Sequence, residues 1–297
     1  MLMSEALGII GLGRTGLAAA KVYLAESHKV YGYDTDANAV ENFRAAGGIV
    51  MNGPHQVAAN VSILLIMVLN DEQVLDVVAG PTGILAGAKG GTTIICMSTI
   101  NREILTTVAS KCAAAGMLFL DCPFTGGPAR IKARTLTLIA AGHEYVLQNA
   151  MPVLEVLGKI VYVGEEPGQA QAVKHCNQLL VGVTHAATME VITLARRSGL
   201  DPSSVISVIA SGIAGSDYFR LLSESVLHRS PSPGSLGQMC KDMAIVRKSV
   251  DEAGMRGLVA FAASEYFSKA LSLGMSEREG ADLIEVVDAS TTDHQTR

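Results

Sequence analysis

The chain has 297 residues, of which 49% are hydrophobic and 17% are charged. This composition supplies a large core and argues against extensive disorder, and the length suits two domains. The net charge is −5, with no basic stripe along the sequence. That charge balance argues against nucleic acid as the main partner.

Cysteine usage and residue spacing narrow the chemistry further. The five cysteines are scattered and form no CxxC pair, so we expect free thiols in a reducing compartment. No group of His, Asp and Glu residues has the spacing of a metal site, and we predict no metal. The N-terminus lacks the basic and apolar regions of a signal peptide, and no stretch offers about 18 uninterrupted apolar residues. These features predict a soluble, cytoplasmic protein without a membrane partner.

The first half alternates short apolar runs with helical stretches, which is typical of a parallel sheet covered by helices on both faces. The predicted strands are Leu7–Ile10, Lys29–Tyr33, Ser62–Met67, Thr92–Cys96, Met117–Leu120, Thr135–Ala140 and Ile160–Val163. The predicted helices are Arg14–Glu26, Asn38–Ala46, Asp71–Val78, Arg102–Ala115 and Glu144–Leu157. The fold class is therefore α/β in this half.

The alternation stops after Val163. The turn-rich segment Gly164–Gly168 follows, and everything beyond it is predicted to be helical, with the strongest break at Ser230-Pro-Ser-Pro-Gly234. We place the domain boundary near residue 165, which gives a domain of residues 1–165 and an all-helical domain of residues 166–297.

A glycine-rich turn follows the first predicted strand. Its sequence, Gly11-Leu12-Gly13-Arg14-Thr15-Gly16, has the GxGxxG spacing and leads into the helix at Arg14. Glycine at these places permits a tight turn, lets the backbone approach a pyrophosphate and lets helix and strand pack closely. The free amides and the dipole at the start of the helix favour an anion. The motif therefore predicts a dinucleotide site.

Asp34 directly follows the second predicted strand, 18 residues after Gly16. This is close to the spacing of about 20 residues at which an acidic residue binds the ribose 2′-hydroxyl. A carboxylate there repels a 2′-phosphate, so the sequence favours NAD over NADP. The alternative is that Asp34 is a turn residue ahead of Thr35-Asp36.

The longest predicted helix runs from Gly168 to Ser198, about eight turns, and opens the second domain. Lys174, Asn177 and Gln178 stand at i, i+3 and i+4, so their side chains share one face. Apolar residues flank Lys174, and loss of hydration brings the pKa of a lysine toward neutrality, so Lys174 is a candidate general acid and base. The alternative is a lysine that reaches past apolar surface to water.

Three further motifs follow the glycine turn in order: Asp121-Cys-Pro-Phe-Thr-Gly-Gly127, Lys174-x-x-Asn177-Gln178 and Lys241-Asp242-Met243. Together the four motifs resemble the β-hydroxyacid dehydrogenase family, which includes 3-hydroxyisobutyrate, tartronate semialdehyde and L-threonate dehydrogenases. The resemblance spans Gly8 to about Asp288. It implies a Rossmann-type, doubly wound and mostly parallel sheet, then an all-helical domain joined through the long helix. It also implies substrate in the cleft and a homodimer or homotetramer.

Residue roles follow from the same resemblance. Lys174 matches the catalytic lysine of the family. The matched substrate-binding residues are Thr125, Gly126 and Gly127, which hold the carboxylate, and Asn177 and Gln178, which orient the substrate. The matched cofactor-binding residues outside the glycine turn and Asp34 are Val68 and Leu69 on the adenosine side, Thr99 near the nicotinamide ribose, and Lys241 from the helical domain.

The sequence departs from the family pattern in two informative places. Thr125 stands where serine is usual, so the hydroxyl is kept while the added methyl narrows the pocket. Arg134 stands where glycine is frequent, which puts the local turn in doubt. Arg130, Lys132 and Arg134 are candidates for a positive rim around a more anionic substrate, and the alternative, which we prefer, is a solvated basic loop.

The resemblance implies an NAD-dependent oxidoreductase that transfers hydride between nicotinamide and a small hydroxy acid. Lys174 donates a proton to the carbonyl oxygen as hydride arrives, and its neutral amine removes the alcohol proton in the reverse direction. The Asn-Gln pair favours polyhydroxylated acids such as threonate or glycerate over hydroxyisobutyrate. Two alternatives remain: an imine reductase, which shares the architecture but usually lacks the lysine, and a non-catalytic dinucleotide-binding scaffold.

Four other residues are interpreted as structural. His175 and His185 are predicted to be packed or hydrogen-bonded rather than to act as bases, and Met239 and Met243 are predicted to be core residues. The run Gly215–Tyr218 is a further candidate for contact with substrate from the helical domain.

Overall fold

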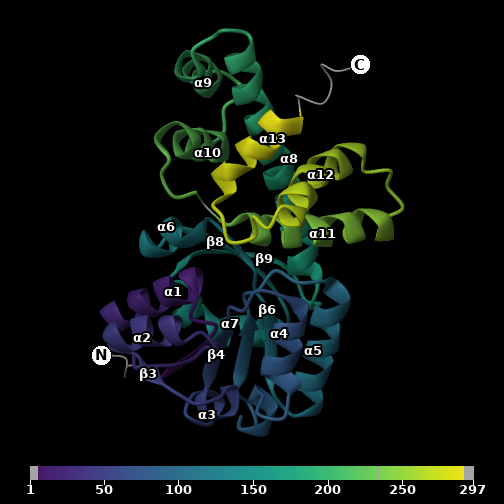
Figure 1. Ribbon diagram of the computed structural model, residues 1–297. Coiled ribbons are helices and arrows are strands. Elements are labelled where there is room, and N and C mark those ends of the chain that lie inside the picture. Colours follow the sequence, from purple (N-terminus) through teal and green to yellow (C-terminus); the bar gives the residue numbers. More distant parts are fainter. Residues whose placement is uncertain (1–5, 233, 291–297) are drawn as a thin grey trace. The chain divides into compact units, whose positions relative to one another are not determined.

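The structure is a computed structural model that describes residues 6–232 and 234–290 (Figure 1). Its backbone divides into two compact units, of which the first ends at Lys174 and the second begins at His175. The helix α8 (Gln169–Arg197) is continuous through this division. The boundary placed near residue 165 lies in the turn between strand β9 (Gly158–Gly164) and α8, and it stays a prediction.

The described part of the first unit contains one sheet of nine strands. Their order is β3-β2-β1-β4-β5-β6-β8-β7, with β9 beside β8. The strands from β3 to β6 run parallel, β8 is antiparallel to β6 and β7, and β9 is parallel to β8. The bounds are β1 Leu7–Ile10, β2 Val30–Tyr33, β3 Ile49–Val50, β4 Ile63–Ile66, β5 Thr93–Cys96, β6 Leu118–Asp121, β7 Phe124–Thr125, β8 Leu136–Ala141 and β9 Gly158–Gly164.

This strand order fixes where a ligand can bind. The sequence 3-2-1-4-5-6 is the doubly wound order, in which the winding reverses between β1 and β4. In such sheets ligands bind outside the carboxyl ends of the strands at the point of reversal. The α/β class and the mostly parallel, Rossmann-type sheet predicted from the sequence are confirmed.

Helices cover both faces of the sheet because neighbouring strand residues point in opposite directions. Ile9 and Leu65 enter one core, with side chains of α1, α2, α6 and α7, while Ile10 and Leu64 enter the other, with α3, α4 and α5. Figure 1 shows α4 and α5 side by side along one side of this unit. The bounds are α1 Arg14–Ala25, α2 Ala37–Ala45, α3 Pro54–Ala59, α4 Asp71–Ala79, α5 Arg102–Ala114, α6 Gly127–Lys132 and α7 Glu144–Leu154.

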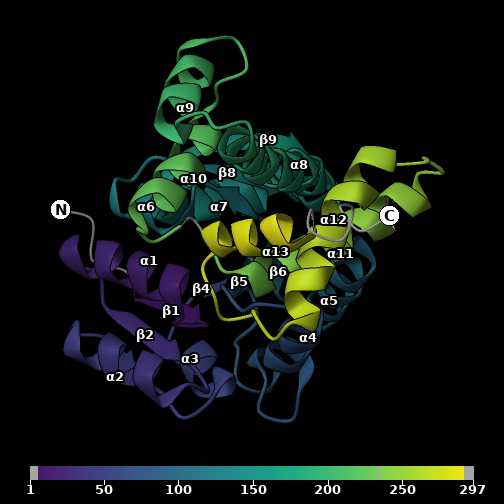
Figure 2. The ribbon, with the colours of Figure 1, turned by 45° about the horizontal axis from the view of Figure 1, so that its top comes forward.

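The described residues of the second unit form helices, as the sequence predicts. After α8 come α9 (Pro202–Ser211), α10 (Asp217–His228), α11 (Leu236–Glu252), α12 (Leu258–Ser272) and α13 (Leu283–Ser290). α12 packs against α11 and α13 (Figure 2). Their shared core includes Met189 of α8, Met243 of α11 and Phe267 of α12, each fully buried. Of the predicted break at 230–234, Pro233 lies outside the described residues.

In the first unit the sequence patterns missed the short strands β3 and β7, the short helices α3 and α6, and the 3-10 helix Ile84–Ala86. β3 and β7 have two residues each, too few for an alternating pattern to show. α6 begins with Gly127-Pro128, which marks a turn in sequence but is also compatible with the first turn of a helix. The longer elements differ from their predicted bounds by a residue or two at most ends, the largest difference being at the end of α7 (predicted Leu157, observed Leu154).

By length and composition alone, α8 is apolar enough to cross a membrane, and it is the one helix of the described chain that meets this test. Half of its most apolar window is buried inside the protein. A buried core helix of a soluble protein meets the same test, so α8 gives no evidence for a membrane.

Candidate functional site

The glycine turn has a backbone that requires glycine at two of its three positions. Gly11 has a φ of 93°, and a Cβ there would lie 2.6 Å from the carbonyl oxygen of Met67 at the end of β4. A Cβ on Gly16 would lie 1.8 Å from the carbonyl oxygen of Gly11. The turn is therefore pressed against both β4 and the first turn of α1, as a dinucleotide fingerprint requires.

The third glycine leaves an open approach to the start of α1. A Cβ on Gly13 would meet no atom within 4 Å, and both Gly13 and Arg14 are exposed. Gly13 is the N-cap of α1, no side chain caps the helix, and its first turn contains no acidic residue. By contrast, α2 and α4 are capped by Asp36 and Asn70. The amides and dipole of α1 thus remain suited to a pyrophosphate.

Asp34 lies directly beside this turn. Its Oδ2 accepts a hydrogen bond from the amide of Leu12 (2.6 Å), and its Oδ1 accepts one from the amide of Asp36 (2.9 Å). Asp34 is therefore a turn residue, as the alternative interpretation states. A carboxylate has further lone pairs, so these two bonds fix its position and leave acceptor capacity for a ribose hydroxyl.

The loops after β4 and β5 are joined by Ser98. Its hydroxyl donates to the carbonyl oxygen of Val68 (2.7 Å), while the amide of Leu69 donates to Oε1 of Gln73 (2.8 Å). Leu69 is exposed and Thr99 is half-buried. Val68, Leu69 and Thr99 thus lie at the carboxyl edge of the sheet, on the same edge as the glycine turn.

Thr125 ends β7, and the chain then turns sharply into α6. Gly126 and Gly127 have φ values of 134° and 67°, which side chains rarely adopt. A Cβ on Gly126 would also lie 2.8 Å from Cδ of Arg130. The Thr-Gly-Gly segment therefore has a backbone that other residues cannot easily reproduce.

Asp121, at the end of β6, is fully buried and accepts three hydrogen bonds from the start of α8. Its Oδ2 accepts from the amides of Gly168 (2.8 Å) and Gln171 (3.2 Å), and its Oδ1 accepts from Nε2 of Gln171 (3.0 Å). Burial raises the pKa of Asp121 to about 6, although these hydrogen bonds act in the opposite direction. The motifs named Asp121 in passing and gave Gln171 no role.

Lys174 follows Gln171 by one helical turn. Its residue is 7% exposed, so the alternative of a lysine that reaches out to water does not describe it. Gln178 is also buried and Asn177 is half-buried, while Val173, Cys176 and Leu180 are exposed. Lys174, Asn177 and Gln178 thus lie on the less exposed side of α8, as their spacing predicts.

In the second unit, Asp242 of α11 joins two of the predicted residues. Its Oδ2 accepts a hydrogen bond from Nε2 of Gln178 (2.6 Å), and Nζ of Lys241 lies 2.7 Å from its Oδ1. Asp242 is buried, whereas the side chain of Lys241 is one-fifth exposed. The KDM motif had drawn attention to Lys241 and left Asp242 without a function.

Both histidines are hydrogen-bonded and both methionines are packed, as the sequence predicts. His175 is hydrogen-bonded to Ser249 (2.8 Å), and His185 to the carbonyl oxygen of Gly280 (2.9 Å) and the hydroxyl of Tyr218 (3.0 Å). Burial lowers the pKa of His185 to about 4. Met239 and Met243 are buried in the core of the second unit.

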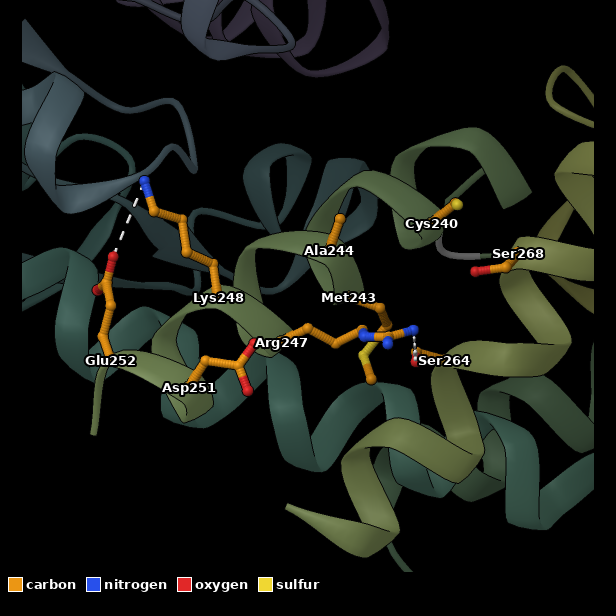
Figure 3. A pocket seen from close by; sticks show the side chains of 9 residues that line it. All are labelled: Cys240, Met243, Ala244, Arg247, Lys248, Asp251, Glu252, Ser264 and Ser268. Atoms are coloured by element: carbon orange, nitrogen blue, oxygen red, sulfur yellow. Dashed lines mark hydrogen bonds and ion pairs between the residues drawn. The ribbon is translucent and has the colours of Figure 1, made fainter. Parts of the chain in front are cut away.

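A pocket of about 500 Å³ lies between α11 and α12 (Figure 3). Two of its basic lining residues have partners: Arg247 contacts Ser264, Glu265 and the ring of Phe261, and Lys248 is paired with Glu252. The predicted site residues are not among those that line it, although Cys240 and Met243 flank Lys241 and Asp242 in sequence.

The basic residues after Thr125 are split by the fold. Arg134 has a φ of 58°, the left-handed conformation that glycine adopts most easily, and its guanidinium pairs with Glu26 at the end of α1. Arg130 and Lys132 are exposed on α6. The chain therefore still turns at Arg134, although an arginine, and not a glycine, adopts the left-handed conformation there.

Among the described residues, no three His, Cys, Asp or Glu side chains are grouped so that they could hold a metal ion. The five cysteines are free, with Cys96, Cys112 and Cys122 buried and Cys176 exposed.

Comparison with known proteins places the two halves. Residues 6–164 match the model of the NAD binding domain of 6-phosphogluconate dehydrogenase, and residues 168–287 match the model for NAD-binding of NADP-dependent 3-hydroxyisobutyrate dehydrogenase. The L-threonate dehydrogenase of Escherichia coli (strain K12) is 29% identical over 288 residues, which cover 96% of this chain and 95% of the relative.

Solved structures agree with this placement. The crystal structure of 3-hydroxyisobutyrate dehydrogenase from Salmonella typhimurium has a TM-score of 0.87 at 26% identity, covering 95% of this chain and 99% of that one. Psf3 in complex with NADP+ and 2-OPP has a TM-score of 0.89 at 26% identity over the same shares. An imine reductase from Pseudomonas, at 18% identity and a TM-score of 0.65, shares the fold alone.

Proposed function

We propose that this protein transfers hydride between NAD and a small hydroxy acid, with Lys174 as the general acid and base. The starting point is that the chain belongs to the β-hydroxyacid dehydrogenase family. Oxidoreductase activity and an NAD(P)-binding domain follow from the family itself. The observation that carries the finer proposal is the buried Lys174, one turn beyond a helix start that is hydrogen-bonded to the carboxyl edge of the sheet.

The protein residues would handle the proton and the carboxylate. Bound NAD supplies the hydride acceptor. In the oxidative direction the neutral amine of Lys174 takes the proton from the alcohol oxygen, and in the reverse direction its ammonium returns a proton to the carbonyl oxygen. Thr125 and the amides of Gly126 and Gly127 hold the substrate carboxylate, and Asn177 and Gln178 orient its hydroxyl groups without adding charge.

The preference for NAD over NADP rests on the end of β2. Asp34 is held beside the glycine turn by the Leu12 amide, and Asp36 follows two residues later as the cap of α2. Two carboxylates at this position repel a 2′-phosphate. A matching NADP+ complex among the relatives makes this a point to test directly.

The substrate class is the second finer point. The Asn177-Gln178 pair favours polyhydroxylated acids such as L-threonate or glycerate, and the L-threonate dehydrogenase of E. coli at 29% identity supports the same choice. Thr125, with its extra methyl, favours a compact group beside the carboxylate.

A substrate panel tests the proposal. Purified protein is incubated with L-threonate, D-glycerate, 3-hydroxyisobutyrate and other 2- and 3-hydroxy acids, each with NAD or NADP, and NAD(P)H is followed at 340 nm. We expect L-threonate or glycerate with NAD to give the highest kcat/KM. Reduction of cyclic imines without oxidation of any hydroxy acid would favour the imine reductase alternative, and cofactor binding without turnover would favour the scaffold.

Assembly and location are proposed on separate grounds. A homodimer or homotetramer is supported by large apolar side chains that α8 leaves exposed, such as Leu180 (65%) and Leu194 (67%). A cytoplasmic location is supported by five free thiols. Light scattering coupled to size-exclusion chromatography tests the first, and fractionation of the source cells tests the second.

A further inference from the structure

We propose that Asp121 and Gln171 are positioning residues for Lys174: together they fix the first turn of α8 on the carboxyl edge of the sheet and so set where the lysine nitrogen lies. The catalytic consequence rests on the function proposed above. The geometry itself does not depend on it.

The start of α8 has no cap of its own. Gly168 precedes the helix with a φ of 101° and has no side chain to accept the amides of the first turn. Asp121 takes this role from β6, 47 residues earlier in the chain, through its bonds to the amides of Gly168 and Gln171. A cap normally comes from the residue beside the helix. Here the helix start is bonded to the sheet through Asp121, in addition to the bonds between Gln169 and Glu166 of the preceding turn.

Gln171 extends the same attachment to a second strand end. Its Nε2 donates to Asp121 and to the carbonyl oxygen of Ser98 (3.0 Å), and its Oε1 accepts from the amide of Ile100 (3.2 Å). These bonds use both amide hydrogens and one oxygen lone pair, so the amide has a single satisfactory orientation. Ser98 in turn binds the carbonyl oxygen of Val68, which connects α8 to the loops after β4, β5 and β6.

Lys174 lies three residues beyond Gln171 on the same helix, so any shift or rotation of the first turn moves its side chain as well. Proton transfer needs a hydrogen-bond distance to the reacting oxygen. A displacement of 1 Å caused by a distant substitution can reduce the rate about 100-fold.

The choice of a carboxylate for this task is informative. Three N–H donors converge on Asp121, and the ionised group accepts all of them. An asparagine in its place would turn an NH₂ group toward at least one donor. Burying a charge without a cation is unfavourable, and the donors and the dipole of α8 offset part of that cost. A buried carboxylate at position 121, despite this cost, is consistent with a role in fixing the position of the helix start as well as in stabilising the fold.

The test compares three variants with a matched control. Asp121→Asn disrupts the convergence of donors, and Gln171→Glu sets an oxygen against Asp121. The double variant again offers a donor and an acceptor between residues 121 and 171, although the bond to Ser98 is lost. Asp201→Asn is the control, because Asp201 also caps a helix through two backbone amides, those of Ser203 and Ser204 at the start of α9.

We expect kcat to fall about 10- to 100-fold in each single variant and to recover about 10-fold in the double variant. The dissociation constant of NADH, measured by its fluorescence, should change less than about threefold, and Asp201→Asn should keep its kcat. Unchanged kcat in both single variants, or a loss of NADH binding that parallels the loss of rate, would overturn the proposal. If Asp121→Asn does not fold, Gln171→Met removes the side-chain bonds alone and serves in its place.

Two readouts do not depend on turnover. Hydrogen exchange over residues 165–178 should accelerate about 10-fold in Asp121→Asn, and acylation of Lys174 by an amine-specific reagent should become faster, both followed by mass spectrometry. If the wild type oxidises no hydroxy acid while both rates respond, the proposed function fails and the positioning role stands. If neither rate responds, the positioning role fails, whatever the activity.

Discussion

Each unit of this protein buries an aspartate beside a residue with a proposed role, and the two aspartates are held in different ways. Asp121 in the first unit is bonded to uncharged donors, two of them backbone amides. Asp242 in the second unit is bonded to side chains, the amide of Gln178 and the ammonium of Lys241. The first fixes the backbone of a helix, and the second orients two polar groups.

This difference separates two effects on catalysis. Moving the helix that carries an acid–base group changes the distance for proton transfer and therefore kcat. Releasing side chains that contact substrate or cofactor weakens binding and therefore raises KM. The two carboxylates are thus expected to give opposite kinetic patterns when replaced by amides.

The largest effect is expected at Lys174. Asp121 and Asp242 are both proposed to act indirectly, through other residues, whereas Lys174 is proposed to transfer the proton itself. Lys174→Ala should lower kcat by about 10³- to 10⁵-fold, since it removes the acid–base group and its charge together. Lys174→Arg keeps the charge but cannot release a proton near neutrality, so it should also lose most of its activity. Steady-state kinetics with the best acid of the panel check both. Near-normal turnover in Lys174→Ala would show that Lys174 is not the general acid and base.

The second unit should lose stability in acid because of His185. Burial holds the pKa of His185 at about 4, below the usual 6.5, so the unfolded chain binds a proton more readily between these pH values. The resulting stabilisation is present above pH 6.5 and disappears as the pH falls toward 4, an effect of about 3 kcal/mol. Urea unfolding of wild type and His185→Gln from pH 4 to 8 measures it. A parallel pH dependence in the two proteins would contradict the assignment.

The first unit should respond to pH with the opposite sign through Asp121. Its pKa of about 6 is above the usual 3.8, so the folded state holds the extra proton between these values. Stability from this group is complete below pH 3.8 and is lost as the pH rises through 6, by about 3 kcal/mol. The stability of the Asp121→Asn variant relative to that of the wild type should therefore increase as the pH rises. Hydrogen exchange resolved by peptide separates this trend from that of His185.

Replacing Asp242 should affect binding more than rate. Asp242→Asn removes the charge beside Lys241 and can turn an NH₂ group toward Gln178, so we expect KM for the hydroxy acid to rise about 10-fold while kcat changes less than about threefold. The comparison with Asp121→Asn under identical conditions is the control. If kcat fell in both variants and KM in neither rose, the division of labour between the two aspartates would be wrong.

The smallest effect is expected at Arg134. Its guanidinium pairs with Glu26, so we expect it to take no part in substrate binding. Arg134→Gly relieves the left-handed backbone and loses an exposed ion pair worth little. We expect KM to change less than about twofold. A large rise in KM for dianionic acids, but not for monoanionic ones, would restore the positive-rim interpretation.

Local sequence was sufficient for the features that depend on backbone geometry and periodicity. The GxGxxG turn, the parallel strands and the long helix all follow from glycine spacing, apolar runs and helix formers, and each lies where the patterns predict. The shared face of Lys174, Asn177 and Gln178 follows from helical spacing alone.

The two buried aspartates could not be assigned in this way. Asp121 meets its donors across 47 and 50 residues of sequence, and Asp242 meets Gln178 across 64, so no local pattern relates the partners. A signal was nevertheless present, because each aspartate lies within a motif, and Asp121 also ends the apolar run of β6, where a buried charge needs a partner. The short elements β3, β7 and α6 were missed because tertiary contacts, not length, sustain them.

The borrowed cap of α8 also determines how this protein can be divided or recombined. Cutting the chain at residue 165 would strand the Asp121 carboxylate inside the first unit without Gly168 and Gln171 to satisfy it. A chimera that exchanges halves with a relative should therefore take residues 1–174 from one protein. Asp121 and the amides of Gly168 and Gln171 that bind it then come from the same sequence.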